Sequence, residues 1–150
     1  HRYGLTVLQF TFYGMPLIYN GQEIGDPDTL NYFTDAKVKW ECVDHKMLNT
    51  VRSLIALHHQ QPSLGESAPV RFLETSDSQV LAWQRGGVVV AVNFGPYDAR
   101  FVIPSLADGH YQQWLDSRTI LDGPRVTHCK LSATEPLQLE ANGYAVYVIQ

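Results

Sequence analysis

The sequence lacks several features that would assign it to a large class of proteins. Its 150 residues include only two cysteines, Cys42 and Cys129, which lie far apart and form no C-x-x-C pair. This spacing indicates neither a disulfide framework nor a zinc site, and we expect two free, buried thiols. No apolar run approaches the ~18 residues that a membrane-spanning helix needs, so we expect no membrane partner.

The chain also lacks a basic charge excess and the length of a complete barrel. Eleven Lys and Arg residues face fifteen Asp and Glu residues, which gives a formal net charge of −4. Because the cationic residues are scattered, they create no basic field for a phosphate backbone, and we expect no nucleic-acid partner. A complete (β/α)8 barrel of ~250 residues does not fit this length. The chain starts at His1 without an initiator methionine, so we expect it to be part of a longer protein.

The first sixty residues predict a helix, a strand, a loop and a second helix. Residues 5–13 (LTVLQFTFY) are apolar around most of a helical wheel, and Gly14 ends this buried helix. Residues 16–20 form a short, continuously apolar run, which favours a strand of a parallel sheet whose neighbours come from elsewhere. Asp44 caps a second helix, whose apolar residues recur at i, i+3, i+4 and i+7.

The predicted loop at residues 22–43 carries the strongest candidates for ligand contact. Loops of this length are usually functional or disordered. Its acidic residues follow the predicted strand, where the rim of an α/β site would lie, although turn-forming, solvated Asp explains them equally well. Glu23 stands between two glycines, where a close backbone approach is favoured. Trp40 ends the loop, and its ring suits either stacking on a sugar or packing in the core.

Beyond residue 63 the apolar pattern changes to a period of two, which is typical of strands. We predict strands at residues 70–74, 79–85, 88–94, 99–103, 110–115 and 143–149. The Gly86-Gly87 pair between two of them is a two-residue hairpin turn signal. These features predict an antiparallel sandwich or open barrel, with residues 88–92 as a central strand covered on both faces. Trp83 alternates with polar residues, and we expect it in the core or at an interface.

One motif in the first part resembles a known family. The run GMPLIYNGQEIG at residues 14–25 is similar to the segment around the eighth barrel strand of the α-amylase superfamily, glycoside hydrolase family 13. The preceding helix, Trp40 and the helix SLIALHHQQPSL follow the order of that family, and the later strands resemble its C-terminal antiparallel domain. The resemblance implies an α+β chain. Residues 1–66 would form the helix-strand-helix end of a (β/α)8 barrel, and residues 67–150 an antiparallel β-sandwich.

The resemblance also implies a function for the longer protein. Members of this family act on α-glucans with retention, through two carboxylates and a covalent glycosyl-enzyme intermediate. The family's nucleophile Asp, its acid/base Glu and a third, transition-state-stabilising Asp come from the fourth, fifth and seventh strands. We therefore assign no catalytic residue here and expect the chain alone to be inactive. Glu23 and Trp40 are the expected substrate-binding residues. We assign no metal ligand and no cofactor to this chain, and the resemblance allows calcium in the parent protein.

Two alternatives remain open at this stage. In the first alternative, the chain is a non-catalytic module that binds carbohydrate or another protein. In the second, it is a two-layer structural domain with no ligand. A carbohydrate-binding β-domain would use exposed aromatic residues, for which the sequence offers Trp114 and Tyr111. In every case, residues 1–30 expose apolar surface if the barrel is incomplete, so we expect self-association, domain swapping or disorder there.

Overall fold

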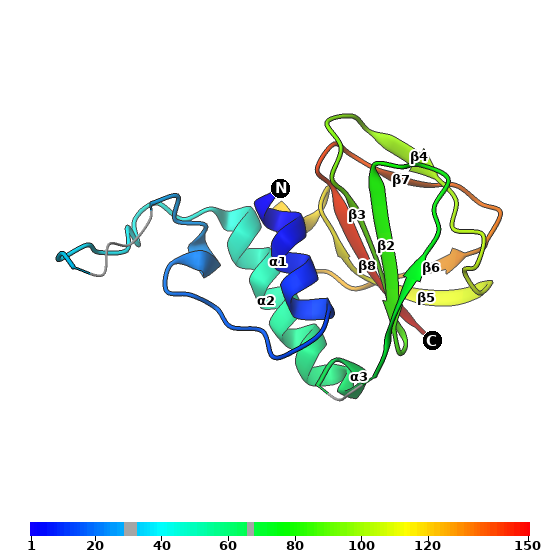
Figure 1. The fold of residues 1–150 in the computed structure, drawn as a ribbon, viewed down its shortest axis with the longest axis horizontal. Coiled ribbons are helices and arrows are strands. Elements are labelled where there is room, and N and C mark those ends of the chain that lie inside the picture. Colours follow the sequence, from blue (N-terminus) through cyan, green and yellow to red (C-terminus); the bar gives the residue numbers. More distant parts are fainter. Residues whose placement is uncertain (29–32, 66–67) are drawn as a thin grey trace.

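The computed structural model describes residues 1–28, 33–65 and 68–150. Two helices, α1 (Arg2–Thr11) and α2 (His45–Gln60), lie side by side and cover one face of an antiparallel sheet (Figure 1). Three short helical turns accompany them: η1 (Gln22–Ile24), α3 (Pro62–Gly65) and η2 (Ile120–Asp122). Within the described ranges, no helix has the length and apolar character needed to cross a membrane.

The strands form two sheets, and every pairing is antiparallel. The larger sheet has six strands in the order β1-β2-β3-β8-β5-β6, and β4 pairs with β7 in a small second sheet. Their bounds are β1 (Val70–Leu73), β2 (Val80–Arg85), β3 (Val88–Asn93), β4 (Ala99–Phe101), β5 (Gly109–Asp116), β6 (Thr127–Leu131), β7 (Leu137–Leu139) and β8 (Tyr144–Ile149). In Figure 1 the β4-β7 pair lies across one end of the larger sheet.

Two hydrophobic clusters lie on opposite faces of the larger sheet. The first joins α1 and α2 to the sheet through residues such as Val7, Leu54 and Trp83. The second joins the other face of the sheet to β4 and β7 through residues such as Val89 and Phe101. All six residues of β3 are buried, as predicted for a central strand covered on both faces. Trp83 is completely buried, which confirms its expected place in the core.

Buried hydrogen bonds cross from the helices to the sheet. The Trp83 indole N–H donates to the Thr11 hydroxyl at 3.2 Å, and the Thr50 and Tyr144 hydroxyls lie 2.7 Å apart. These contacts satisfy polar groups that would otherwise be costly to bury. They also fix how the helices sit on the sheet, because an apolar contact alone has no preferred direction.

Asp44 connects the start of α2 to α1, as well as capping α2 as predicted. Its carboxylate accepts hydrogen bonds from the Met47 N–H at 3.0 Å and from the Tyr3 hydroxyl and the Arg2 guanidinium at 2.6 Å each. Burial by itself raises the pKa of Asp44, but these hydrogen bonds and the Arg2 charge outweigh it, so the pKa lies below its ordinary value. Asp44 is therefore ionised, and its carboxylate links the two helices.

The strand predicted at residues 16–20 is not observed. Residues 12–20 contain no helix or strand, and Met15 and Leu17 are 92% and 75% exposed. A parallel strand needs hydrogen-bonding neighbours, and none of the described residues pairs with this segment. The two flanking helices are confirmed, although α1 begins at Arg2 and ends at Thr11 rather than spanning residues 5–13.

The predicted strands of the second part are confirmed to within a few residues. Two observed strands, β6 and β7, are not among the predicted strands. β7 has only three residues, which is too short to show alternation, and it follows Pro136 directly. The two cysteines are free as expected, but their predicted burial is wrong, since Cys42 is exposed and Cys129 partly exposed. The predicted boundary between residues 66 and 67 lies outside the described residues, as do residues 29–32 of the predicted loop.

We expect Asp44→Ala to destabilise the chain by about 1–3 kcal/mol at pH 7, because it removes a helix cap and two charge-assisted hydrogen bonds. Because the pKa of Asp44 is lowered on folding, its contribution is present above the unfolded pKa of ~3.9 and is lost as the pH falls through the lower folded value. Urea unfolding of both proteins at pH 7 and in the acid range measures the difference.

The exposed carboxylate Glu41 supplies the matched control for this variant. Glu41→Ala should leave the free energy of unfolding within about 0.5 kcal/mol of the original, as for most surface substitutions. A loss for Asp44→Ala that stayed constant down to pH 2 would show that the carboxylate charge does not stabilise the helix pair.

Candidate functional site

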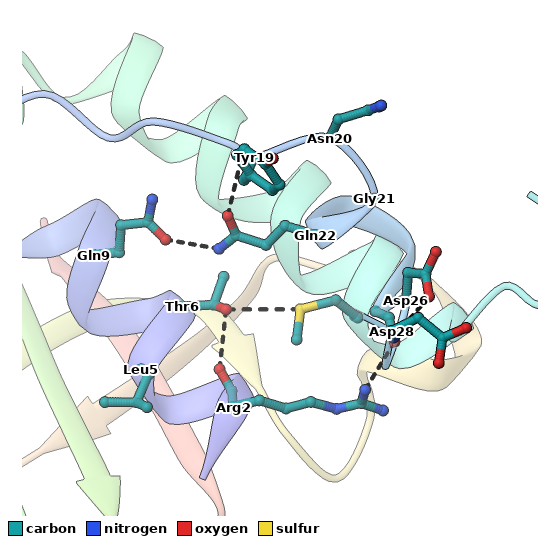
Figure 2. Close-up of a pocket in the computed structure, with 12 residues that line it drawn as sticks. Arg2, Leu5, Thr6, Gln9, Tyr19, Asn20, Gly21, Gln22, Asp26 and Asp28 are labelled. Atoms are coloured by element: carbon teal, nitrogen blue, oxygen red, sulfur yellow. Dashed lines mark hydrogen bonds between the residues drawn. The ribbon is translucent and has the colours of Figure 1, made fainter. Parts of the chain in front are cut away.

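A hollow lies between α1, the segment at residues 19–28 and the start of α2 (Figure 2). Its volume of about 360 Å³ falls within the range of small-molecule sites. It is lined by Arg2, Leu5, Thr6, Gln9, Tyr19, Asn20, Gly21, Gln22, Gly25, Asp26, Asp28 and Met47. We call this hollow the helix-side pocket.

Two glycines shape the segment that closes the pocket. Gly21 and Gly25 flank the 3-10 turn η1, with φ values of 93° and 68°, in the left-handed region that favours glycine. A Cβ atom at Gly25 would lie 2.9 Å from the Cβ of Asp44, which is closer than carbon atoms pack. The turn can therefore approach the N-terminus of α2 only because residue 25 has no side chain.

Side-chain amides hold this segment against α1. The Gln22 Nε2 donates to the Gln9 Oε1 at 2.7 Å, and the Gln22 Oε1 accepts from the Tyr19 N–H at 3.1 Å (Figure 2). The Gln9 Nε2 in turn donates to the Leu17 carbonyl. These bonds anchor residues 17–22 although no strand forms there, and they leave amide groups at the mouth of the pocket.

Charged groups occupy the other end of the pocket. The Arg2 Nη1 donates to the Gly25 carbonyl at 2.8 Å. Asp26 accepts from the backbone N–H groups of Asp28 and Lys39 at 3.0 Å each, and these bonds lower its pKa. The Asp28 carboxylate raises the pKa of Lys39, with which it forms an ion pair. At neutral pH Asp26 therefore stays ionised, so it accepts hydrogen bonds and cannot supply a proton.

Neither of the two residues expected to bind substrate lines this pocket. Glu23 is on η1 and partly buried, and its Oε2 accepts from the Gly21 N–H at 3.0 Å. Trp40 is 54% exposed and lies within the described range 33–65. Their assignment as substrate contacts stays a prediction. The sequence analysis did not identify Gln9 and Gln22 as residues of a pocket. The sequence offers only a weak indication of this role, since each is a polar residue in or beside an apolar run.

The aromatic residues proposed for a carbohydrate-binding surface are buried. Trp114 is 7% exposed and its indole N–H donates to the Ser53 carbonyl at 2.9 Å. Tyr111 is 1% exposed and its hydroxyl donates to the Ala107 carbonyl at 2.7 Å. Neither ring can therefore stack on a sugar. The alternating pattern of β5 did not predict which of its side chains are exposed. The strand is covered on both faces, and its register against β8 shifts between Gln113 and Leu115.

The described residues contain no group of three or more His, Cys, Asp or Glu side chains that could hold a metal ion. The helix-side pocket instead offers amide donors and acceptors, one guanidinium and two carboxylates. This set suits a hydrogen-bonded polar ligand.

Comparisons with known proteins show the family to which the second part of the chain belongs. Residues 73–150 match the model of a family described as the C-terminal all-beta domain of alpha amylase. Among curated proteins, Alpha-amylase MalA of Haloarcula japonica is 28% identical over an alignment of 109 residues, with a coverage of 67% of this chain and 16% of that protein.

Solved structures resemble nearly the whole chain. The debranching enzyme of Nostoc punctiforme, in crystals soaked with acarbose, matches 98% of this chain and 28% of its own, with 22% identity and a TM-score of 0.67. The protein Ttha1563 of Thermus thermophilus matches 99% of this chain and 31% of its own, with 23% identity and a TM-score of 0.72. At these identities the likeness shows the fold alone. The chain spans less than a third of the length of either protein.

Proposed function

Because the chain belongs to the family of α-amylase C-terminal all-β domains, we propose that it is the C-terminal part of an α-glucan-active glycoside hydrolase that retains anomeric configuration. The resemblance to the α-amylase superfamily that the motif at residues 14–25 indicates is confirmed by the family match and the curated relative. The observation that carries the proposal is the match at residues 73–150, which spans the strands from the end of β1 to β8. α-Glucans are the proposed substrates of the parent protein.

The first part of the chain is proposed to be the end of a (β/α)8 barrel, with its limit at residue 66. Its element order supports this assignment, since α1, an unpaired apolar segment and α2 follow one another as helix, strand and helix would. Tyr13, Met15 and Leu17 are at least half exposed, at 58%, 92% and 75%. Apolar residues of a barrel strand expose their side chains in this way when the neighbouring strands lie in another part of the protein.

Retaining hydrolysis requires two carboxylates across the scissile bond, about 5–5.5 Å apart. In the resemblance these come from strands that precede this chain, so we propose no catalytic residue here. Calcium, if the parent protein uses it, is likewise proposed for residues outside this chain. The competing proposal, a non-catalytic module, is distinguished by the parent sequence, because it requires that the carboxylates of strands four, five and seven have been lost.

We expect the purified 150-residue chain to have no activity on starch, maltooligosaccharides or pullulan. We expect the longer parent protein to hydrolyse at least one of these glucans or to transfer glycosyl units from it. Release of reducing ends, with a heat-killed sample as control, measures both. Turnover by the chain alone would overturn the assignment of catalysis to other residues. An inert parent that keeps all three carboxylates would overturn the proposed activity itself.

Trp40 and Glu23 are proposed to contact the glucan from the rim loop. In the parent protein, Trp40→Ala should raise KM for maltooligosaccharides about threefold to tenfold with a smaller change in kcat, because a stacking contact with the sugar is lost. Trp40→Phe keeps an aromatic face and should recover most of the loss. Equal KM values for the original protein and Trp40→Ala would remove Trp40 from the site.

Self-association through residues 1–30 is proposed for the chain when it is isolated from its parent. Light scattering should give a mass above that of the monomer, and Leu17→Lys should reduce it, because a charge disfavours burial of this 75% exposed residue. The matched control is Leu121→Lys, at a residue of η2 that is 62% exposed and lies outside residues 1–30. A monodisperse monomer whose first 28 residues are protected from amide exchange would contradict the proposal.

A further inference from the structure

The β-domain has a second pocket, remote in sequence from the helix-side pocket. Its volume is about 240 Å³, and it lies over the small β4-β7 sheet, beside the turn that follows β5. Buried Ala99 and Leu139 line it together with a set of charged and amide side chains, Asp98, Arg100, Arg118, Gln138 and Glu140. We call it the β-domain pocket.

Register brings two of these polar residues together. Arg100 of β4 pairs directly with Gln138 of β7, and the neighbouring pairs Ala99–Leu139 and Phe101–Leu137 belong to the second hydrophobic cluster. Arg100 and Gln138 are both exposed. Among the described residues, neither side chain has a hydrogen-bond or ion-pair partner, so both are available to a ligand.

The other three polar groups are held in position by contacts with the surrounding chain. Arg118 binds the buried Asp116 through its Nε at 3.2 Å and its Nη2 at 2.8 Å, and this pairing raises the pKa of Arg118. The Asp98 carboxylate accepts from the Ala141 N–H at 2.9 Å, and Glu140 forms a 3.3 Å ion pair with Lys46. Each group is thereby oriented, yet each has further donor or acceptor capacity.

The balance of charge indicates which ligands fit. Two guanidinium groups and two carboxylates line the pocket, so its formal charge is zero, and the carboxylates oppose an anion as much as the guanidinium groups oppose a cation. A chain of neutral sugars has hydroxyl groups that both donate and accept, which matches a lining of both kinds. The volume is below the usual range for a whole small-molecule ligand, so a segment of a longer chain suits it better than a complete oligosaccharide.

An exposed aromatic residue adjoins one of the lining residues along the chain. Tyr97 directly precedes Asp98 and is 73% exposed. Its carbonyl and that of Glu140 both accept from the Asn93 side-chain amide, at 2.7 and 2.9 Å, so the buried Asn93 ties the Tyr97 turn to the pocket. Aromatic faces suit the apolar faces of sugar rings. This is the type of residue that the buried Trp114 and Tyr111 cannot supply.

We propose that the β-domain pocket is a non-catalytic binding site for a neutral α-glucan chain, with Arg100 and Gln138 as its hydrogen-bonding residues and Tyr97 beside it as a stacking residue. The choice of an α-glucan among neutral saccharides rests on the proposed function. The pocket itself rests on the residues described above. Such a site would hold polymeric substrate on the parent protein without taking part in hydrolysis.

The test is binding by the 150-residue chain, measured as retardation in a native gel containing soluble starch and by calorimetry with maltoheptaose. The double variant Arg100→Ala with Gln138→Ala should bind about tenfold more weakly or worse, because hydrogen bonds to a charged donor are lost. Tyr97→Ala should also weaken binding. Arg125→Ala, at an exposed arginine that does not line the pocket, should bind like the original chain.

Each other outcome overturns the proposal. The first such outcome is that starch does not retard the original chain. The second is that the double variant binds as tightly as the original chain. The third is that Arg125→Ala loses as much affinity as the double variant. Binding that disappears in about 0.5 M NaCl, or that inorganic phosphate displaces, would mean an anion site instead, because contacts with a neutral glucan are only weakly screened by salt. Circular dichroism of the double variant checks that it is folded.

This experiment is independent of the proposed activity. If the parent protein fails to act on any α-glucan while the chain still binds one through this pocket, the proposed function falls and the site remains. If the parent is active and the chain binds nothing, the site falls and the proposed function remains.

Discussion

The structure depends on the coverage of strand β3 on both of its faces. β3 lies between β2 and β8 in the larger sheet, and all six of its residues are buried. The helices cover one face, and the β4-β7 pair covers the other. Burial of this kind is non-directional, so the hydrogen bonds that cross the interfaces, such as that between Trp83 and Thr11, select one arrangement among those that would exclude water equally well.

Much of this arrangement is encoded locally and could be predicted. The period-two pattern indicated most strands, because alternation is a property of a strand with one polar face. The Asp44 cap and the apolar stripe of α2 are likewise local signals. The segment at residues 16–20 shows the limit of this reasoning, since an apolar run acquires strand geometry only when another strand is present to bond to it. The exposed Leu17 reflects that dependence.

The candidate sites were harder to predict, because they arise from residues that are distant in sequence. Gln9 and Gln22 meet through a turn set by two left-handed glycines, and Arg100 meets Gln138 only through the register of β4 with β7. Trp114 and Tyr111 illustrate the opposite error, in which residue type suggested exposure but packing on both faces of β5 buried the rings. Glu23 and Trp40 are close in sequence to the helix-side pocket without lining it.

The shared core of the helices and the sheet bears on how such a chain can be recombined. Val7, Leu54 and Trp83 belong to one cluster, although the first two precede the all-β segment and the third lies within it. A graft that transferred only residues 67–150 to another scaffold would leave the helix-facing side of β2, β3 and β8 uncovered. The transferable module is therefore larger than the family match, and a fusion junction placed before Arg2 would preserve it.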